Sequence, residues 1–132
     1  MKKAFFLCAF CALILLAGCG GARESAALDR NASFFSDFSI DGEQVVFDCH
    51  LVIDNNTDAA VSVRITGDFS ADADAGLLKE TSLPAAAKDG GASVFVLQPG
   101  KNTIDVVFTG THGDIDTKLN RLLPGITIEP AG

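Results

Sequence analysis

The chain has no tryptophan, and its one methionine is Met1. A blue-copper site uses two histidines, one cysteine and a weak axial methionine, so the lack of an internal methionine argues against that site. No serine lies in the Gly-x-Ser-x-Gly pattern of a hydrolase nucleophile, and His50 and His112 have no recognisable catalytic partners. We therefore expect a protein that is not an enzyme.

Basic residues are scarce as well. Ten lysines and arginines stand against 17 aspartates and glutamates, which gives a formal net charge of −7. Nucleic-acid binding needs basic side chains to neutralise phosphates, and anionic lipid headgroups likewise attract basic clusters. The composition thus disfavours nucleic acid as a partner and disfavours an electrostatic attachment to membranes.

The amino terminus combines charge, apolarity and small residues in a characteristic order. Lys2 and Lys3 precede an apolar run over residues 4–17, and Gly18 and Cys19 follow it. A charged start, an apolar stretch of about 7–15 residues and small residues before a cut are typical of a secretory signal. The run is too short to cross a bilayer as a helix of about 20 residues.

The end of this segment, Leu16-Ala17-Gly18-Cys19, resembles the lipobox of bacterial lipoproteins. The resemblance implies that a peptidase cleaves between Gly18 and Cys19, and that Cys19 then carries diacylglycerol and an acyl chain, with no other cofactor. It also implies a cell-membrane lipid anchor that faces the periplasm or the cell exterior. Two or more acyl chains attach a protein stably, whereas one chain is only marginal.

Three segments follow from this interpretation: a signal peptide over 1–18, the lipidated cysteine with a flexible tether over 19–33, and one domain over 34–132. The tether is small and polar and lacks apolar periodicity. Cys8 and Cys11 leave with the signal, so Cys49 remains without a disulfide partner. Loss of two lysines also takes the formal net charge from −7 to −9.

Apolar residues in the domain recur with period two, which is typical of strands with one buried face. The clearest pattern runs over residues 45–53, where the odd-numbered side chains are apolar and predicted to be buried. Asp41-Gly42 before it predicts a tight hairpin. Further strands are predicted at 61–66, near 77–83, and at 93–98, 103–109 and 126–128.

These short strands, with no convincing amphipathic helix, predict an all-β fold: a two-sheet antiparallel immunoglobulin-like sandwich of six to seven strands. The tryptophan and the inter-sheet disulfide of antibody domains are missing, so the likeness is one of architecture. The stretch from Phe38 to Pro130, including Asn120-Arg121-Leu122-Leu123-Pro124, also resembles sandwich domains of small uncharacterised bacterial lipoproteins. That resemblance implies no particular activity.

Two groups of residues invite a functional interpretation that strand geometry weakens. Cys49 and His50 are adjacent on one strand and so project to opposite faces, which argues against a metal site shared with His112. We expect Cys49 to be a core residue. Phe34, Phe35 and Phe38 could form an exposed patch, but packing of a first strand on its neighbour is the favoured interpretation.

Acidic residues offer an alternative function. Asp68, Asp72 and Asp74 lie in one predicted loop and Asp114 and Asp116 in another. Carboxylates are hard ligands suited to calcium, although the spacing does not match a known calcium loop. The two loops would meet at one end of the domain only if the predicted strand near 77–83 does not cross it.

The sequence as a whole predicts a membrane-anchored, non-catalytic binding or interaction module of the bacterial cell envelope. Its partner would be an envelope protein or a small ligand. The alternative is a sandwich that binds calcium or another metal through the acidic loops. An exported enzyme ranks third, because it would need an accessible thiolate at Cys49.

Overall fold

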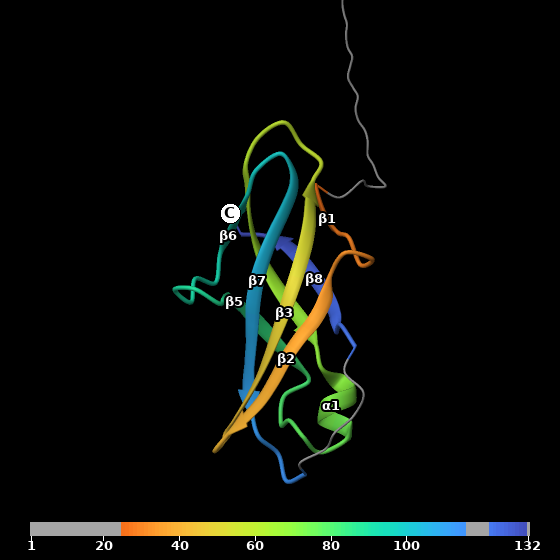
Figure 1. The fold of residues 1–132 in the computed structure, drawn as a ribbon, viewed down its shortest axis with the longest axis vertical. Coiled ribbons are helices and arrows are strands. Elements are labelled where there is room, and N and C mark those ends of the chain that lie inside the picture. The colour runs from red at the N-terminus through yellow and green to blue at the C-terminus, as the bar shows by residue number, and fades with distance from the viewer. Residues whose placement is uncertain (1–24, 116–121, 132) are drawn as a thin grey trace, which may run out of the picture.

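The computed structural model describes residues 25–115 and 122–131, so the predicted signal segment, Gly18, Cys19 and Asp116 lie outside the described residues. The described chain forms eight strands and one short helix (Figure 1). In chain order these are β1 (Ala26–Leu28), β2 (Phe34–Asp41), β3 (Gln44–Asn55), β4 (Val61–Asp68), α1 (Ser70–Asp74), β5 (Ser82–Ala87), β6 (Phe95–Leu97), β7 (Gly100–Thr111) and β8 (Gly125–Pro130).

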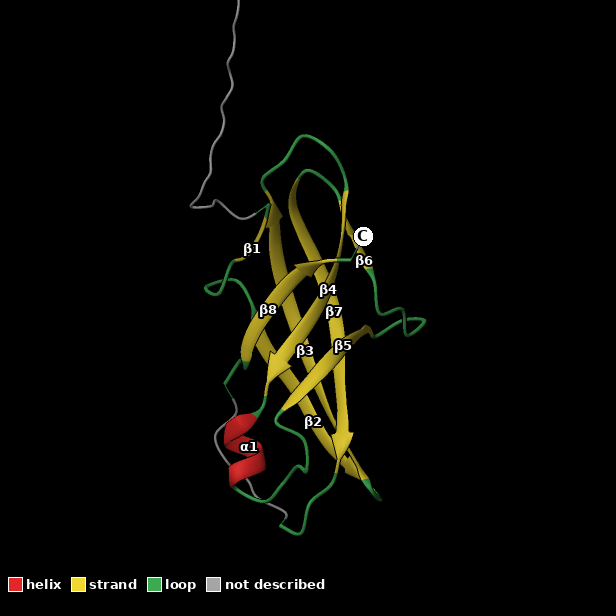
Figure 2. Ribbon diagram, turned by 180° about the vertical axis from the view of Figure 1, so that it is seen from behind, coloured by secondary structure: helices red, strands yellow, loops and turns green. Residues whose placement is uncertain are grey.

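All pairings between these strands are antiparallel, and they form a nearly barrel-like sheet. The strand order is β1-β3-β7-β5-β4-β6, with β2 also on β3 and β8 also on β4. One strand joins the two halves, because the start of β5 pairs with β4 and its end pairs with β7. Figure 2 shows β4, β5 and β8 in front of β3 and β7. The all-β prediction is confirmed, with eight strands instead of six or seven.

The alternation predicted along β3 is confirmed. Its odd-numbered residues from 45 to 53 are at most 1% exposed and form the centre of the core together with Val106 and Phe108. The opposite face is less open to water than predicted at Val52, which is 5% exposed. The segment before β2 covers it, since the Ser33 hydroxyl accepts a hydrogen bond from the Val52 N–H.

The tether boundary needs correction. Residues 26–28, assigned to the flexible tether over 19–33, form β1 and pair with Ile53, Asp54 and Asn55 of β3. Ala26 is buried in the core. A three-residue strand among alanines carries too little apolar periodicity to be recognised, so the folded domain begins earlier than position 34.

The region between β4 and β6 also differs from the prediction. The acidic stretch that was predicted as loop contains α1, and the predicted strand near 77–83 lies instead at Ser82–Ala87. Leu77 and Leu78 are buried but belong to a connecting segment, in which Leu78 makes an isolated bridge to His112. The isolated leucines therefore indicate buried positions, but they do not indicate a strand.

The predicted hairpin turn is confirmed, one residue later than the Asp41-Gly42 pair. Asp41 pairs with Gln44 across a loop of two residues, Gly42 and Glu43, and Gly42 has a φ of 62°. Such left-handed geometry is what glycine supplies in a tight hairpin. The strands predicted at 103–109 and 126–128 form the middle of β7 and β8.

Candidate functional site

The acidic residues singled out in the sequence lie at the end of the domain that contains α1. Asp68 ends β4, Asp72 and Asp74 belong to α1, and Asp114 follows β7. The two loops adjoin there, because the N–H of Gly113 donates to the Leu77 carbonyl at 2.7 Å and that of Ile115 to the Gly76 carbonyl at 3.0 Å. The acidic loops therefore meet at one end, as they should if residues 77–83 do not cross the fold (Figure 1).

Although the two acidic loops adjoin, their side chains do not form a set of metal ligands in the described part of the chain. Within residues 25–115 and 122–131, no three histidine, cysteine, aspartate or glutamate side chains are grouped so that they could hold a metal ion. Asp68 serves the local turn instead: its Oδ1 accepts the Ser70 N–H at 3.0 Å and the Ser70 hydroxyl at 2.6 Å. These bonds lower the pKa of the Asp68 carboxyl below its ordinary value of 3.8.

Cys49 and His50 lie on opposite faces of β3, as strand geometry predicted. The Cys49 thiol is in the core, and burial, with a smaller effect of the negative charge of Asp48, raises its pKa to about 12. The His50 ring stacks on Phe34 with 4.8 Å between ring centroids, and its Nδ1 lies 2.9 Å from Asp105 Oδ1. A neutral buried thiol and an outward-facing imidazole do not form one site.

A cavity of about 440 Å³ lies at the α1 end of the domain. It lies between β2, the β4–α1 junction and the start of β8, and we call it the α1-end groove. Its base is aromatic, and its exposed rim combines polar Asp68 and Ser70 with apolar Ala71 and Leu122. The lining residues are Phe35, Phe47, Asp68, Phe69, Ser70, Ala71, Asp72, Leu122, Leu123, Pro124 and Gly125.

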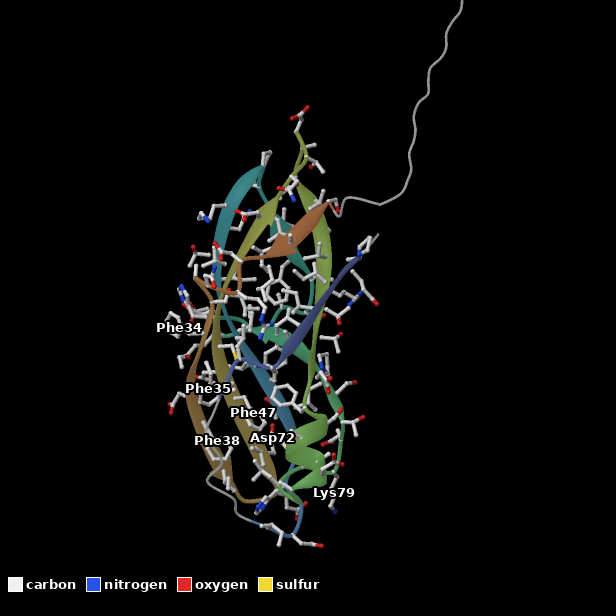
Figure 3. All side chains as sticks on the ribbon, turned by 90° about the vertical axis from the view of Figure 1, so that its right-hand side faces the viewer. Phe34, Phe35, Phe38, Phe47, Asp72 and Lys79 are labelled. Carbon is white, nitrogen blue, oxygen red and sulfur yellow. The ribbon has the colours of Figure 1, made fainter. Side chains whose placement is uncertain are left out.

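An irregularity in β2 produces the aromatic base. Phe35 and Phe38 are three residues apart and would face opposite sides of a regular strand. A bulge between Phe35 and Asp37 inserts Ser36, which restores both rings to the inner face. Both then pack on Phe47, with ring centroids 6.5 and 5.3 Å away, while Phe34 remains outside and 52% exposed (Figure 3).

Phe69 completes the base, and Gly67 makes room for it. The Phe69 ring lies 4.6 Å from the Phe47 ring and 5.2 Å from the Phe108 ring, measured between centroids. A Cβ at Gly67 would stand 2.7 Å from Phe69 Cε2 and 2.9 Å from Phe108 Cε1. Such separations are too short for real contacts, so this close packing requires glycine.

The groove is part of a seam between two strand edges. In the described residues β2 pairs only with β3, and β8 pairs only with β4. Arg30 spans the seam, since its guanidinium donates to the carbonyls of Leu123 at 3.2 Å and Pro124 at 3.4 Å. A smaller cavity of about 210 Å³ lies farther along, lined by Ser25, Ala26, Val63, Ile128, Glu129 and Pro130.

Sequence reasoning missed the groove because its residues come from four separate segments. Phe35 was assigned to strand packing and Asp68 and Asp72 to an acidic loop, and Leu122-Leu123-Pro124 was noted only for its resemblance to small bacterial lipoproteins. One signal was available: three phenylalanines at 34, 35 and 38 fit no single strand face, which points to a bulge.

Comparison with protein-family models, with curated proteins and with solved structures finds no match to this chain. Nowhere in residues 25–115 and 122–131 is there a helix with the length and apolarity needed to cross a bilayer. Any functional assignment therefore depends on the residues themselves.

Proposed function

We propose that this protein is a membrane-anchored, non-catalytic binding module of the bacterial cell envelope, and that the α1-end groove receives its partner. The partner is an envelope protein or a small ligand. The observation that carries the proposal is the 440 Å³ cavity with a phenylalanine base beside exposed Leu122, which is 83% exposed. Ligand sites typically have volumes of about 300–1,000 Å³, mostly apolar walls and a few polar groups.

The fold supports this use. We infer an immunoglobulin-like sandwich in which β5 connects the two layers by pairing with both β4 and β7. Such a scaffold holds its strands rigidly and leaves its ends for recognition. The groove lies at one of these ends.

A position-specific crosslink in intact cells tests the groove. A photo-crosslinking amino acid at position 122 should capture a partner, whereas the same amino acid at position 96, which is 59% exposed on β6, should not. Ala71→Trp, on the groove rim, should abolish the adduct; Ala92→Trp, exposed in the β5–β6 loop, should leave it unchanged. Equal capture from positions 122 and 96 would refute the groove as the binding site.

The anchor is proposed from the resemblance of Leu16-Ala17-Gly18-Cys19 to a lipobox. Cys19→Ala should move the protein from the membrane fraction to the soluble envelope fraction, because no acyl chain can then be attached. Cys11→Ala leaves the motif intact and is the matched control. Retention of the Cys19→Ala chain in membranes would overturn the lipid anchor.

Calcium binding is the second candidate, favoured by the meeting of the two acidic loops at the α1 end. The residues concerned are Asp68, Asp72, Asp74, Asp114 and Asp116. Titration calorimetry with calcium against chelator-treated protein tests it. No heat and an unchanged melting temperature would eliminate this function.

An enzyme that uses Cys49 is the third candidate function. Thiol reagents attack the thiolate, and burial raises the pKa of the Cys49 thiol to about 12, so little thiolate is present near neutral pH. We expect labelling of Cys49 to be complete only after unfolding in denaturant. Rapid labelling of the folded protein would revive the enzyme hypothesis.

A further inference from the structure

The segment between Cys19 and the folded domain is shorter than predicted, because the domain begins at β1. The Ser25 carbonyl accepts a hydrogen bond from the Asn56 N–H at 2.8 Å, and Ala26 pairs with Asn55. Ser25 is only six positions after Cys19. A fully extended chain spans at most about 3.6 Å per residue, so Ser25 can lie no more than about 22 Å from Cys19.

This attachment point lies at one end of the domain. The β3–β4 turn over residues 56–60 and the β6–β7 turn over residues 98–99 form that end, which we call the turn end. α1 lies at the other end, where the His112 N–H donates to the Glu43 carbonyl just before β3 and Gly113 adjoins the segment after α1. Figure 1 shows β1 beside the upper part of β3 and α1 at the lower end. β3 runs between the two ends for 12 residues, a length of about 36 Å at about 3.3 Å per residue.

The short segment does not span the length of the domain. A lipidated Cys19 lies at the membrane surface, and with the α1 end turned toward that surface Ser25 would be about 36 Å away from it. The greatest reach of the chain from Cys19 to Ser25 is about 22 Å. Chain length therefore rules out the inverted orientation, whereas an orientation with the turn end toward the membrane needs only a small part of this reach.

The charges on the domain favour the turn end over the outer face of the sheet as the surface next to the membrane. The two turns contain one charged residue, Asp58. The outer face of β2, β3 and β7 carries Asp37, Asp48 and Asp105, of which Asp48 pairs with Lys88 at 3.1 Å. Anionic headgroups attract basic surfaces and repel acidic ones, so the outer face is the less favourable contact.

Taking the lipid anchor of the proposed function as a premise, we propose that the six-residue connection from Cys19 to Ser25 holds the turn end against the membrane surface. The surface that the turn end contacts is the headgroup layer of the anchoring bilayer. The α1-end groove then opens toward the aqueous phase. A partner of the groove reaches it from that side, and the lipids of the anchoring bilayer do not.

Energy transfer to the bilayer tests this orientation. The lipidated chain, purified from membranes, is placed in vesicles of phosphatidylethanolamine and phosphatidylglycerol that contain a headgroup-labelled acceptor lipid. A donor dye on Asp58→Cys should lie about 30 Å nearer the bilayer than the same dye on Ala71→Cys, given the length of β3. The chain without an added cysteine, whose Cys49 is buried, is the blank for labelling. Equal distances, or a shorter distance from position 71, would overturn the proposal.

A longer connection tests whether chain length determines the orientation. An insertion of about 20 glycine and serine residues after Gly20 raises the root-mean-square reach to about 28 Å, and its full extension exceeds the length of the domain. The difference in distance between the two donors should then shrink. The same insertion between Gly90 and Gly91, in the exposed β5–β6 loop, is the matched control and should leave the difference as it was. An undiminished difference with the longer connection would contradict the proposal.

Crosslinking to lipid separates this inference from the proposed function. On vesicles with radiolabelled phospholipid, a photo-crosslinking amino acid at position 58 should form lipid adducts, and one at position 122 should not. Lipid adducts from position 122 alone would assign the groove to the anchoring bilayer and overturn the inference. If Cys19→Ala releases the chain and position 122 captures a partner in cells, while both donors lie equally far from the bilayer, the proposed function stands and this inference fails. Retention of the Cys19→Ala chain in membranes would overturn both the anchor and the orientation.

Discussion

The two ends of the barrel-like sheet are built differently. At the end with the β3–β4 and β6–β7 turns, the amide side chains of buried Asn55 and half-buried Asn102 hold the loops together. Asn55 Nδ2 donates to the carbonyls of Ala59 and Leu97 at 2.9 Å each, and its Oδ1 accepts from the N–H and hydroxyl of Thr57. At the α1 end a phenylalanine cluster surrounds a cavity instead.

Asn102 holds the β6–β7 turn in the same way: its Nδ2 donates to the carbonyls of Gln98 and Gly100, and its Oδ1 accepts from the Gln98 N–H. Polar groups that are fully satisfied fix a loop in one conformation. Apolar side chains that line an open hollow lack packing contacts on one side, which has a free-energy cost relative to a filled core. The turn end is thus fixed by satisfied polar groups, whereas the α1 end keeps an open apolar hollow, which is where we propose that a partner binds.

The aromatic base of the groove should also carry the largest share of local stability. Phe47 is fully buried and contacts the rings of Phe35, Phe38 and Phe69. Phe47→Ala should lower the free energy of unfolding by about 3–5 kcal/mol in urea denaturation, through lost burial and an enlarged cavity. Phe34→Ala, on the outer face, is the comparison and should change it far less. Similar losses for both would break the distinction between the inner and outer faces of β2.

The end with the β3–β4 and β6–β7 turns should lose stability when the single amide of Asn55 is removed. Asn55→Ala leaves the carbonyls of Ala59 and Leu97 and the Thr57 donors without this partner, so we expect a loss of about 2–3 kcal/mol in the free energy of unfolding. Asp58→Ala, exposed in the same turn, is the matched control. A loss below about 0.5 kcal/mol would show that the turns hold without the amide.

Overpacking tests the junction between core and groove. Gly67→Ala puts a methyl group against Phe69 and Phe108, and should lower the free energy of unfolding by about 1–3 kcal/mol. Because Phe69 lines the groove and must move, capture of a partner from position 122 should weaken as well. Gly125→Ala, whose Cβ would lie 3.4 Å from Asp68 Cβ, makes an ordinary contact and is the control for the stability measurement. Full stability of Gly67→Ala would mean that the rings are less fixed than their separations indicate.

The smallest expected effect concerns pH. Glu80 accepts hydrogen bonds from the Thr111 N–H at 2.8 Å and from its hydroxyl at 2.7 Å, and these bonds lower the pKa of the carboxyl from its ordinary value of 4.5. The stabilisation is therefore fully present above pH 4.5 and is lost as the pH falls through the lower folded-state pKa.

Urea unfolding between pH 3 and 6 measures this contribution. Glu80→Gln should flatten the decline of stability below pH 4.5, and Thr111→Val, which removes only the hydroxyl donor, should flatten it in part. Identical slopes in the wild type and both variants would contradict a role for this contact in acid sensitivity.

Elements with strong local signals could be predicted from the sequence, and those that depend on distant residues could not. The β3 alternation and the Asp41-Gly42 turn are local properties of the chain. β1 is only three residues long, and α1 is a five-residue acidic helix without a buried residue, so neither shows periodicity.

The candidate site illustrates the same limit. Asp68 and Asp72 were recognised as a cluster of charge, but the aromatic base beneath them depends on the Ser36 bulge, on Gly67 and on a segment more than 50 residues later. The dual pairing of β5 has no sequence signature either, because Ser82–Ala87 contains one leucine and three alanines.

The pairing of β3 with β7 governs the order in which this chain can fold. Gln44 pairs with Thr111 and Asn55 with Gly100, so the longest ladder of the described sheet joins segments far apart in sequence. Closing such a loop costs chain entropy before any contact repays it, and folds rich in distant contacts reach the native state slowly. The β2–β3 hairpin joins neighbouring segments and can form early, but the other edge of β3 has no partner until residues 100–111 pair with it.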